Sequence, residues 1–215
     1  MIVDLVHSGH LKILKEASKY GKVVVGLLTN QASGELDDVP YLNYQQRLDV
    51  IENIKFVDSV IEQDSASYRD NLLKLKPDYV IHGDNWKYNH LKKYRKEVIE
   101  LLNGWGGELI EISYSKEIND IHIKDNMRKL GITTSARLGR LRRLIESKKV
   151  VKILEVHNAL SGLIAQNAIE KLDDDSEVTF DGMWSSSLTD STSKGKPDIE
   201  AVDTADEPEE EDSIS

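Results

Sequence analysis

Cysteine is absent from the 215 residues of this chain. Its absence excludes disulfides, thiolate catalysis and cysteine-ligated zinc, and it fits a reducing compartment, so we expect a cytoplasmic protein. The sequence also lacks an apolar run near the roughly 18 residues that a membrane helix needs. A signal peptide is not indicated either, because Asp4, His7 and His10 interrupt the N-terminus. We therefore expect no association with a membrane.

Positive charge is missing from the C-terminal end. Residues 197–215 contain nine acids and no lysine or arginine, whereas the rest of the chain carries 28 positive and 29 negative residues. The formal net charge of −10 is therefore a property of the end of the chain. The composition predicts an acidic disordered tail at 201–215.

Basic residues are concentrated between residues 122 and 152, a range that contains ten lysines and arginines and only two acids. A stripe of this kind can bind phosphates or RNA, but it is more often a solvated helix face. It contains no stacking aromatics, so a nucleic-acid partner is not expected.

Short β-branched runs alternate with helical patterns along the first half of the chain. Strands are predicted at 22–28, 57–61, 79–82 and 108–112, and helices at 9–20, 43–54, 66–75 and 90–103. This alternation predicts an α/β fold with a Rossmann-like parallel sheet, in which ligands bind at the carboxyl ends of the strands. Such a fold should have a strand before its first helix, yet only six residues precede His7.

A second, shorter series follows. Helices are predicted at 120–130, 136–147 and 159–170, and strands at 150–156 and 178–184. Two strands cannot close a sheet or a barrel alone, so this part is expected to be incomplete.

The motif His7-Ser8-Gly9-His10 lies where the chain enters its first predicted helix. A helix N-terminus offers N–H groups and partial positive charge to an anion, and Gly9 permits close backbone approach. Two imidazoles beside it suit a triphosphate that loses pyrophosphate. The alternative is that His7 and His10 are ordinary surface or capping residues.

Four segments carry a resemblance to a known family, at residues 4–11, 25–29, 40–47 and 76–86. They resemble the cytidylyltransferase-type nucleotidyltransferase domain, in the form fused ahead of phosphoenolpyruvate phosphomutase in phosphonate biosynthesis. Residues 153–163 and 184–198 look like the opening of the mutase barrel. The resemblance implies three parts: a nucleotidyltransferase domain at 1–133, an incomplete (β/α) barrel segment at 134–200 and the tail at 201–215.

The resemblance implies a Mg²⁺-dependent reaction with CTP as the nucleotide. His7 and His10 would stabilise the triphosphate, and Asp4 would lie beside the reacting groups. A nucleotide site of Asp4, Gly9, Gly83, Asp84 and Trp86 follows from the same match, with Arg47 steadying the helix beside it. Packing of Trp86 in the core and a helix salt bridge for Arg47 are the alternatives.

In the mutase-like part, Asp198 matches a catalytic aspartate, and Trp184, Ser187 and Leu188 match a substrate-binding turn. The alternative for Asp198 is a plain loop residue. The family's later metal-binding acids and substrate loops are absent, so mutase activity is not expected from this chain alone.

The sequence also departs from the family. Asp37 and Asp38 stand where basic residues are usual, residues 115–121 replace a Ser/Thr-rich helix start, and the match is truncated at both ends. The predicted function is transfer of CMP from CTP to a phosphonate or small phospho-acid. The alternative is a catalytically impaired fragment of a mutase fusion that acts as a binding or interaction protein. A homo-oligomer is left open.

Overall fold

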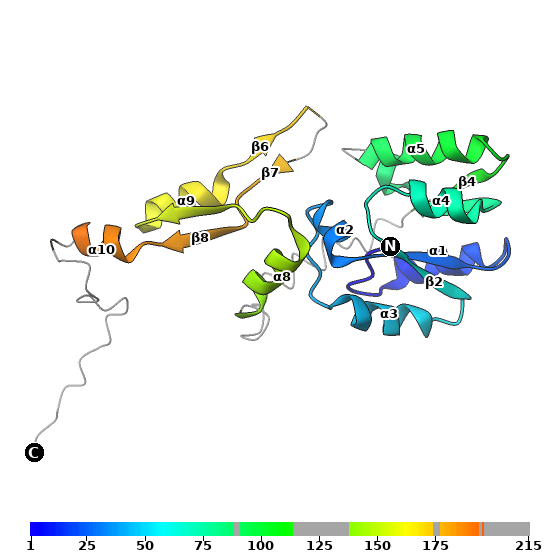
Figure 1. Ribbon diagram of the computed structural model, residues 1–215, viewed down its shortest axis with the longest axis horizontal. Helices are drawn as coiled ribbons and strands as arrows, with labels where there is room; N and C mark the ends of the chain where they lie inside the picture. Colours follow the sequence, from blue (N-terminus) through cyan, green and yellow to red (C-terminus); the bar gives the residue numbers. More distant parts are fainter. Residues whose placement is uncertain (88–90, 114–137, 174–176, 194, 196–215) are drawn as a thin grey trace, which may run out of the picture. The chain divides into compact units, whose positions relative to one another are not determined.

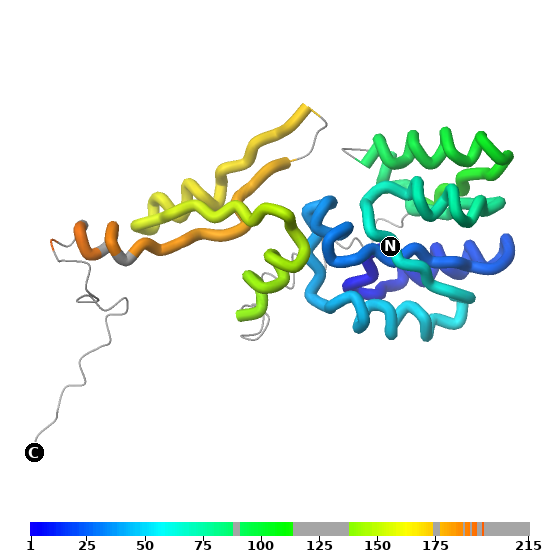
Figure 2. Tube along the Cα trace, viewed as in Figure 1, coloured from blue at the N-terminus to red at the C-terminus, as the bar shows by residue number. Residues whose placement is uncertain are grey.

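The computed structural model describes residues 1–87, 91–113, 138–173, 177–193 and 195 (Figure 1). They fall into two compact units: unit 1 is Met1–Val151 with Asp173–Ser176, and unit 2 is Lys152–Leu172 with Glu177–Ser215. Figure 2 traces the same chain, with all other residues in grey. The domain boundary predicted at 133/134 and the predicted tail at 201–215 both lie outside the described residues.

Unit 1 alternates strands and helices. Its first half contains α1 (Ser8–Ala17), β1 (Val24–Leu28), α2 (Asn30–Gly34), α3 (Tyr44–Glu52), β2 (Ser59–Gln63) and α4 (Arg69–Leu75). Its second half contains β3 (Tyr79–Gly83), the 3₁₀ helix η1 (Asp84–Lys87), α5 (Lys92–Asn103), β4 (Glu108–Ile112) and α8 (Arg140–Ser147). The four strands predicted from the sequence lie within two residues of these bounds, whereas α2 and η1 were not predicted. The helix predicted at 120–130 lies outside the described residues.

The strands pair in parallel, as the alternation predicted. β1 pairs with β2 from Val24 opposite Ser59 to Leu28 opposite Gln63. β3 pairs with β4 from Tyr79 opposite Glu108 to Gly83 opposite Ile112. Among the described residues β1 and β3 are not paired with each other, so unit 1 contains two two-stranded sheets.

Two apolar clusters hold these sheets against their helices. The first surrounds β1 and includes Val25 and Leu27 with Leu14 of α1 and Ile51 of α3. The second lies beside β3 and β4 and includes Leu72, Trp86, Val98 and Leu102. Because apolar side chains leave water when they pack in this way, the clusters supply the main driving force for the fold of unit 1.

Unit 2 contains β5 (Ile153–Val156), α9 (Ala159–Asn167), β6 (Glu170–Lys171), β7 (Glu177–Val178), β8 (Gly182–Ser185) and α10 (Ser187–Ser193). β5 and β8 are parallel, and β6 and β7 form a short antiparallel pair. The single strand predicted at 178–184 is therefore divided between β7 and β8. Within its described residues unit 2 has one parallel pair, and the predicted barrel is not shown.

In the described part of the chain, none of the helices combines the length and the apolar character needed to cross a membrane.

Candidate functional site

Asp4 precedes α1 and lies in a buried position with 4% of its surface exposed. Its Oδ1 accepts hydrogen bonds from the backbone N–H groups of Tyr41 and Leu42, both at 2.9 Å. Its Oδ2 is buried and has no hydrogen-bond partner among the described residues. A buried carboxylate oxygen without a partner is costly, so this atom is suited to receive a cation or a donor from a ligand.

His7 and His10 lie at the start of α1, as the motif predicted. His7 is the N-cap, and its Nδ1 accepts a hydrogen bond from the backbone N–H of Gly9 at 3.0 Å. The two imidazole ring centres are 4.1 Å apart, and both rings are largely buried. His7 thus caps α1 and also lies against the ring of His10. Capping by His7, the bland alternative from the sequence, and the pairing of two imidazoles occur together.

The carboxyl end of β3 leads directly into η1. Gly83 is the last residue of the strand, and Asp84 begins η1 with its Oδ2 accepting from Ser113 Oγ at 2.9 Å. Trp86 is buried to 1% exposure and stacks on His82 with ring centres 3.8 Å apart. Trp86 is therefore a core residue that also forms a wall of the adjoining cavity.

One cavity of about 440 Å³ joins these elements, and we call it the site cavity. Three residues of the predicted nucleotide site line it, Asp4, Gly83 and Trp86, together with His10 of the predicted catalytic pair. Leu28, the last residue of β1, lines it too, so the cavity lies at the carboxyl ends of β1 and β3. His7, Gly9 and Asp84 are not among its lining residues but adjoin ones that are.

Arg47 of α3 organises the carboxyl end of β1 without contacting the site cavity. Its side chain is fully buried, and its Nη1 donates to the carbonyls of Ile2 at 2.7 Å and Leu28 at 2.8 Å. Its Nη2 donates to Oδ1 of Asn30 at 2.7 Å. Burial lowers the pKa of Arg47, while nearby Asp4 opposes this effect. Arg47 thus fixes the loop that carries Asp4. The described contacts of its guanidinium are these three hydrogen bonds, and not the helix salt bridge that the sequence left as the alternative.

Glu111 of β4 was not predicted from the sequence. Its Oε1 accepts from the indole N–H of Trp86 at 2.8 Å and from Nε of Arg95 at 2.9 Å. Nζ of Lys87 lies 3.1 Å from its Oε2. Hydrogen bonds, the strongest from Arg95, lower the pKa of Glu111 to about 2, although partial burial opposes them. No spacing signal could have found this group, because its members lie on three elements.

His82 was predicted only as part of a strand. Its Nδ1 donates to the carbonyl of Gly83 at 2.8 Å, and its ring lies between Trp86 and the edge of Tyr68. Burial lowers the pKa of His82 to about 4, and the nearby amino terminus adds to this effect, against the Gly83 hydrogen bond and the charge of Glu111. The ring is therefore neutral near pH 7.

The two unusual acids have different surroundings. Asp37 forms an ion pair with Lys148, with 2.6 Å between Oδ1 and Nζ. Asp38 lines the site cavity. Lys148 therefore offsets the charge of Asp37 within unit 1. The basic stripe that contains Lys148 is described only from residue 138 onward.

The mutase-like candidates belong to unit 2. Trp184 lies on β8 with 64% of its surface exposed, and Leu188 of α10 is 58% exposed. Ser187 is the first residue of α10, and Asp198 lies outside the described residues. Trp184 and Leu188 are therefore exposed side chains, and neither lines the site cavity.

The site cavity offers one carboxylate oxygen, Oδ2 of Asp4, as a ligand for Mg²⁺. Within the described residues, no three histidine or acidic side chains form a group that could hold a metal ion by themselves. Mg²⁺ is, however, often held by one or two carboxylates together with substrate phosphates. The unpartnered Oδ2 of Asp4 fits that pattern, so Asp4 is the residue that would bind the ion beside a triphosphate.

Comparison with known proteins identifies unit 1. Residues 3–136, more than half of the chain, match the family described as Cytidylyltransferase-like. A FAD synthase from Archaeoglobus fulgidus is 29% identical over 96 residues, which are 42% of this chain and 70% of that protein. A glycerol-3-phosphate cytidylyltransferase from Staphylococcus aureus is 31% identical over 126 residues, which are 57% of this chain and 91% of that protein.

A solved lipopolysaccharide core biosynthesis protein from Thermoplasma volcanium is also similar, with a TM-score of 0.45 and 24% identity over 55% of this chain and 93% of that chain. The family match ends at residue 136, so the resemblance of residues 153–163 and 184–198 to a mutase barrel stays a prediction. Unit 1 combines the matching sequence with parallel α/β pairs and a cavity at their carboxyl ends. The chain therefore belongs to the cytidylyltransferase-like family of nucleotidyltransferases.

Proposed function

We propose that this chain transfers a nucleotidyl group from a nucleoside triphosphate, with CTP as the first candidate, to an oxygen of a small phospho-acid. The acceptor oxygen forms a bond to the α-phosphorus, the bond from that phosphorus to the bridging oxygen breaks, and pyrophosphate leaves. The observation that carries this proposal is the site cavity, where Asp4 and His10 meet the carboxyl end of β3 at Gly83.

The residues of unit 1 supply positioning and charge for this reaction. The N-terminus of α1 offers N–H groups to the phosphates, and His10 would donate to the charge that develops on the leaving pyrophosphate. His7 holds the first turn of α1 through Gly9 and so orients His10. Mg²⁺ bound at Asp4 would neutralise phosphate charge when it is present.

The acceptor follows from two separate likenesses. The resemblance of residues 153–163 and 184–198 to a mutase favours a phosphonate, and the similarity to glycerol-3-phosphate cytidylyltransferase favours a phosphate monoester. Both are small anions that carry a nucleophilic phosphoryl oxygen, and both belong in the test.

The test is pyrophosphate release by the full chain with Mg²⁺, using CTP or ATP with either glycerol 3-phosphate or methylphosphonate. We expect release that depends on one triphosphate and one acceptor, with a new phosphoanhydride visible by phosphorus NMR. His10→Asn should lower the rate by about 100-fold or more, because one donor to the transition state is lost. His157→Asn, at an exposed position in unit 2, is the matched control and should leave the rate unchanged.

Absence of acceptor-dependent pyrophosphate release with all four combinations would contradict the proposal. An unchanged rate in His10→Asn would contradict the assigned role of this residue. Calorimetry with CTP and Mg²⁺ separates binding from turnover, since a chain that binds without turnover would favour the binding-protein alternative.

A further inference from the structure

Two carboxylates line the site cavity, those of Asp4 and Asp38, and both belong to loops. Asp4 is held by the backbone N–H groups of Tyr41 and Leu42, and Asp38 follows the turn that ends α2. A loop fixes a side chain less firmly than a helix or strand does, unless other elements hold the loop. The positions of both acids therefore depend on what contacts residues 34–42.

Helix α8 packs against this loop. Its Leu144 and Ser147 are buried. The carbonyl oxygen of Ser147 comes so near to Gly34 that a Cβ there would lie 1.8 Å from it. The helix begins beyond residue 136, where the family match ends, so it is an addition to the matched domain. Side chains of α8 thus reach the loop from a fixed position.

Lys148, which directly follows α8, holds the turn before Asp38. Its Nζ lies 2.6 Å from Oδ1 of Asp37, and its side chain is only 11% exposed. Asp37 has φ of 55°, a left-handed conformation that is uncommon outside glycine and persists only where the surroundings support it. The ion pair supplies such support. It therefore helps to set the direction in which the chain enters the cavity at Asp38.

Arg143 of α8 lies over the ring of Tyr41. Its Cζ is 5.4 Å from the ring centre, within the distance of about 6 Å at which a cation is attracted to an aromatic face. The backbone N–H of the same tyrosine donates to Oδ1 of Asp4 at 2.9 Å. Holding Tyr41 thus holds one of the two donors that orient the Asp4 carboxylate. The place of the unpartnered Oδ2 is set with it.

We propose that α8 positions both carboxylates of the site cavity. Arg143 acts on Asp4 through Tyr41, and Lys148 acts on Asp38 through Asp37. Neither basic residue lines the cavity, so both are positioning residues. The consequence of this arrangement rests on the proposed function: a carboxylate already held in place can receive Mg²⁺ beside the triphosphate without first being ordered.

The first test measures amide exchange in the full chain. Arg143→Gln should speed exchange at Tyr41 and Leu42 by about threefold or more, because the cation over the ring is lost. Arg143→Lys keeps a cation there and should retain most of the protection. Arg142→Gln removes the same charge from an exposed position of α8 and should leave both amides unchanged. Exchange at Ile110 of β4 is the internal reference for global opening.

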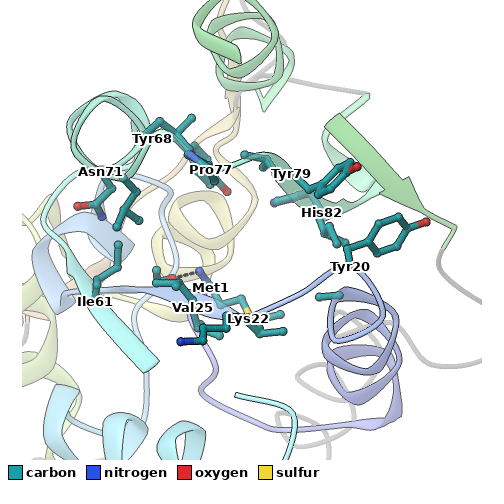
Figure 3. Close-up of a pocket in the computed structure, with 18 of the residues that line it drawn as sticks. Met1, Tyr20, Lys22, Val25, Ile61, Tyr68, Asn71, Pro77, Tyr79 and His82 are labelled. Carbon is teal, nitrogen blue, oxygen red and sulfur yellow. Dashed lines mark hydrogen bonds between the residues drawn. The ribbon is translucent and has the colours of Figure 1, made fainter. Parts of the chain in front are cut away.

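A second variant tests whether the effect passes through the ring. In Tyr41→Leu, adding Arg143→Gln should have no further effect on exchange at Leu42, because the contact is already gone. Tyr20→Leu is the control for loss of a tyrosine ring elsewhere in unit 1. Figure 3 shows that ring beside Tyr79, and the two ring centres are 5.2 Å apart. This control should leave Leu42 unchanged.

Lys148 has its own readout. The N–H of Asp38 donates to the carbonyl of Ser33 at 3.1 Å, and Lys148→Gln should speed exchange of this amide by about threefold or more. Lys149→Gln, at the exposed neighbouring position, should not. Equal exchange in the two variants would overturn the role of Lys148.

A third measurement asks whether the positioning matters for the site. The Mg²⁺ concentration that gives half-maximal pyrophosphate release should rise about threefold or more in Arg143→Gln, with the KM for CTP at saturating Mg²⁺ changed less than twofold. A raised KM for CTP with an unchanged Mg²⁺ requirement would overturn the proposal. Equal exchange at Tyr41 in Arg143→Gln and Arg142→Gln, or an effect of Arg143→Gln that persists in Tyr41→Leu, would also overturn it. The exchange results need no turnover, so they decide the inference even if the pyrophosphate assay fails.

Discussion

Trp86 donates its indole N–H to Oε1 of Glu111 at 2.8 Å, and Nε of Arg95 donates to the same oxygen at 2.9 Å. A ring that forms a wall of the site cavity is thus fixed by a charged acceptor on a neighbouring element. The acidic group orients Trp86, so the shape of the cavity depends on β4 as well as on η1.

Glu111→Gln should lower the free energy of unfolding by about 1 to 2 kcal/mol, because the charge-assisted bonds from Arg95 and Lys87 are lost. The value is reduced because Arg95 is partly solvated, with 34% of its side chain exposed. Chemical denaturation at pH 7 measures the change. Glu100→Gln is the control: its partner Lys96 is 80% exposed, and we expect a change below about 0.5 kcal/mol. Equal losses in the two variants would contradict the orienting role.

Stability should fall as the pH drops from 6.5 to 4, because His82 has its pKa lowered to about 4. The unfolded chain binds a proton on this ring in that interval and the folded chain does not, so protons favour unfolding. The stabilisation is complete above pH 6.5 and is lost on passing through pH 4.

His82→Phe keeps a ring against Trp86 and removes the titrating group, and denaturation measured at pH 7 and pH 4.5 compares the two proteins. We expect the variant to lose about 2 kcal/mol less between these pH values than the unchanged chain. Part of the pH dependence should persist in the variant, because the Met1 amino group also has a lowered pKa, about 5, and gains its proton as the pH falls. Identical pH profiles for the two proteins would contradict a neutral buried His82.

Asp38→Asn should tighten the binding of CTP with Mg²⁺ by about three- to fivefold, because one negative charge leaves the lining of the site cavity. Calorimetry at low ionic strength measures the affinity. Asp49→Asn changes the net charge equally on the exposed part of α3 and should have a much smaller effect. The same gain in both variants would assign the effect to net charge alone.

Gly34→Ala should destabilise the contact between α2 and α8. A Cβ at Gly34 would lie 1.8 Å from the carbonyl oxygen of Ser147, and backbone must move to admit it. We expect a loss of about 1 to 3 kcal/mol and faster amide exchange in α8. Gly162→Ala in α9 is the control, since its Cβ would meet only Sδ of Met183 at 3.9 Å. Unchanged exchange in α8 would contradict this close approach.

The sequence predicted the features that depend on local pattern. The runs around Val25 and Ile110 are apolar at strand spacing, and His7 precedes a helical periodicity, so the strands and the start of α1 could be located. The convergence of Asp4, His10, Gly83 and Trp86 was predicted from the resemblance rather than from periodicity, and the structure brings these four to one cavity.

Features that depend on contacts across the fold could not be predicted. Arg47 reads as an exposed helix residue, yet it is fully buried because three acceptors from distant segments surround its guanidinium. Glu111 alternates with apolar residues as a solvent-facing position would, and only the folded arrangement brings Trp86 and Arg95 to it. That β1 and β3 are not paired with each other among the described residues was not predicted either, because the sequence of one strand does not specify its partner.

Because of the position of the Met1 amino group, the rate at which it reacts with a reagent reports how often unit 1 opens locally. It is held against Gly26 beside a buried guanidinium, whereas the surface lysines are solvated. An acylating reagent should therefore modify lysines such as Lys96 first and Met1 last, at the rate at which unit 1 opens. A group attached to this nitrogen would have to fit beside the Gly26 carbonyl and Arg47, so a label at the amino terminus is expected to disturb β1.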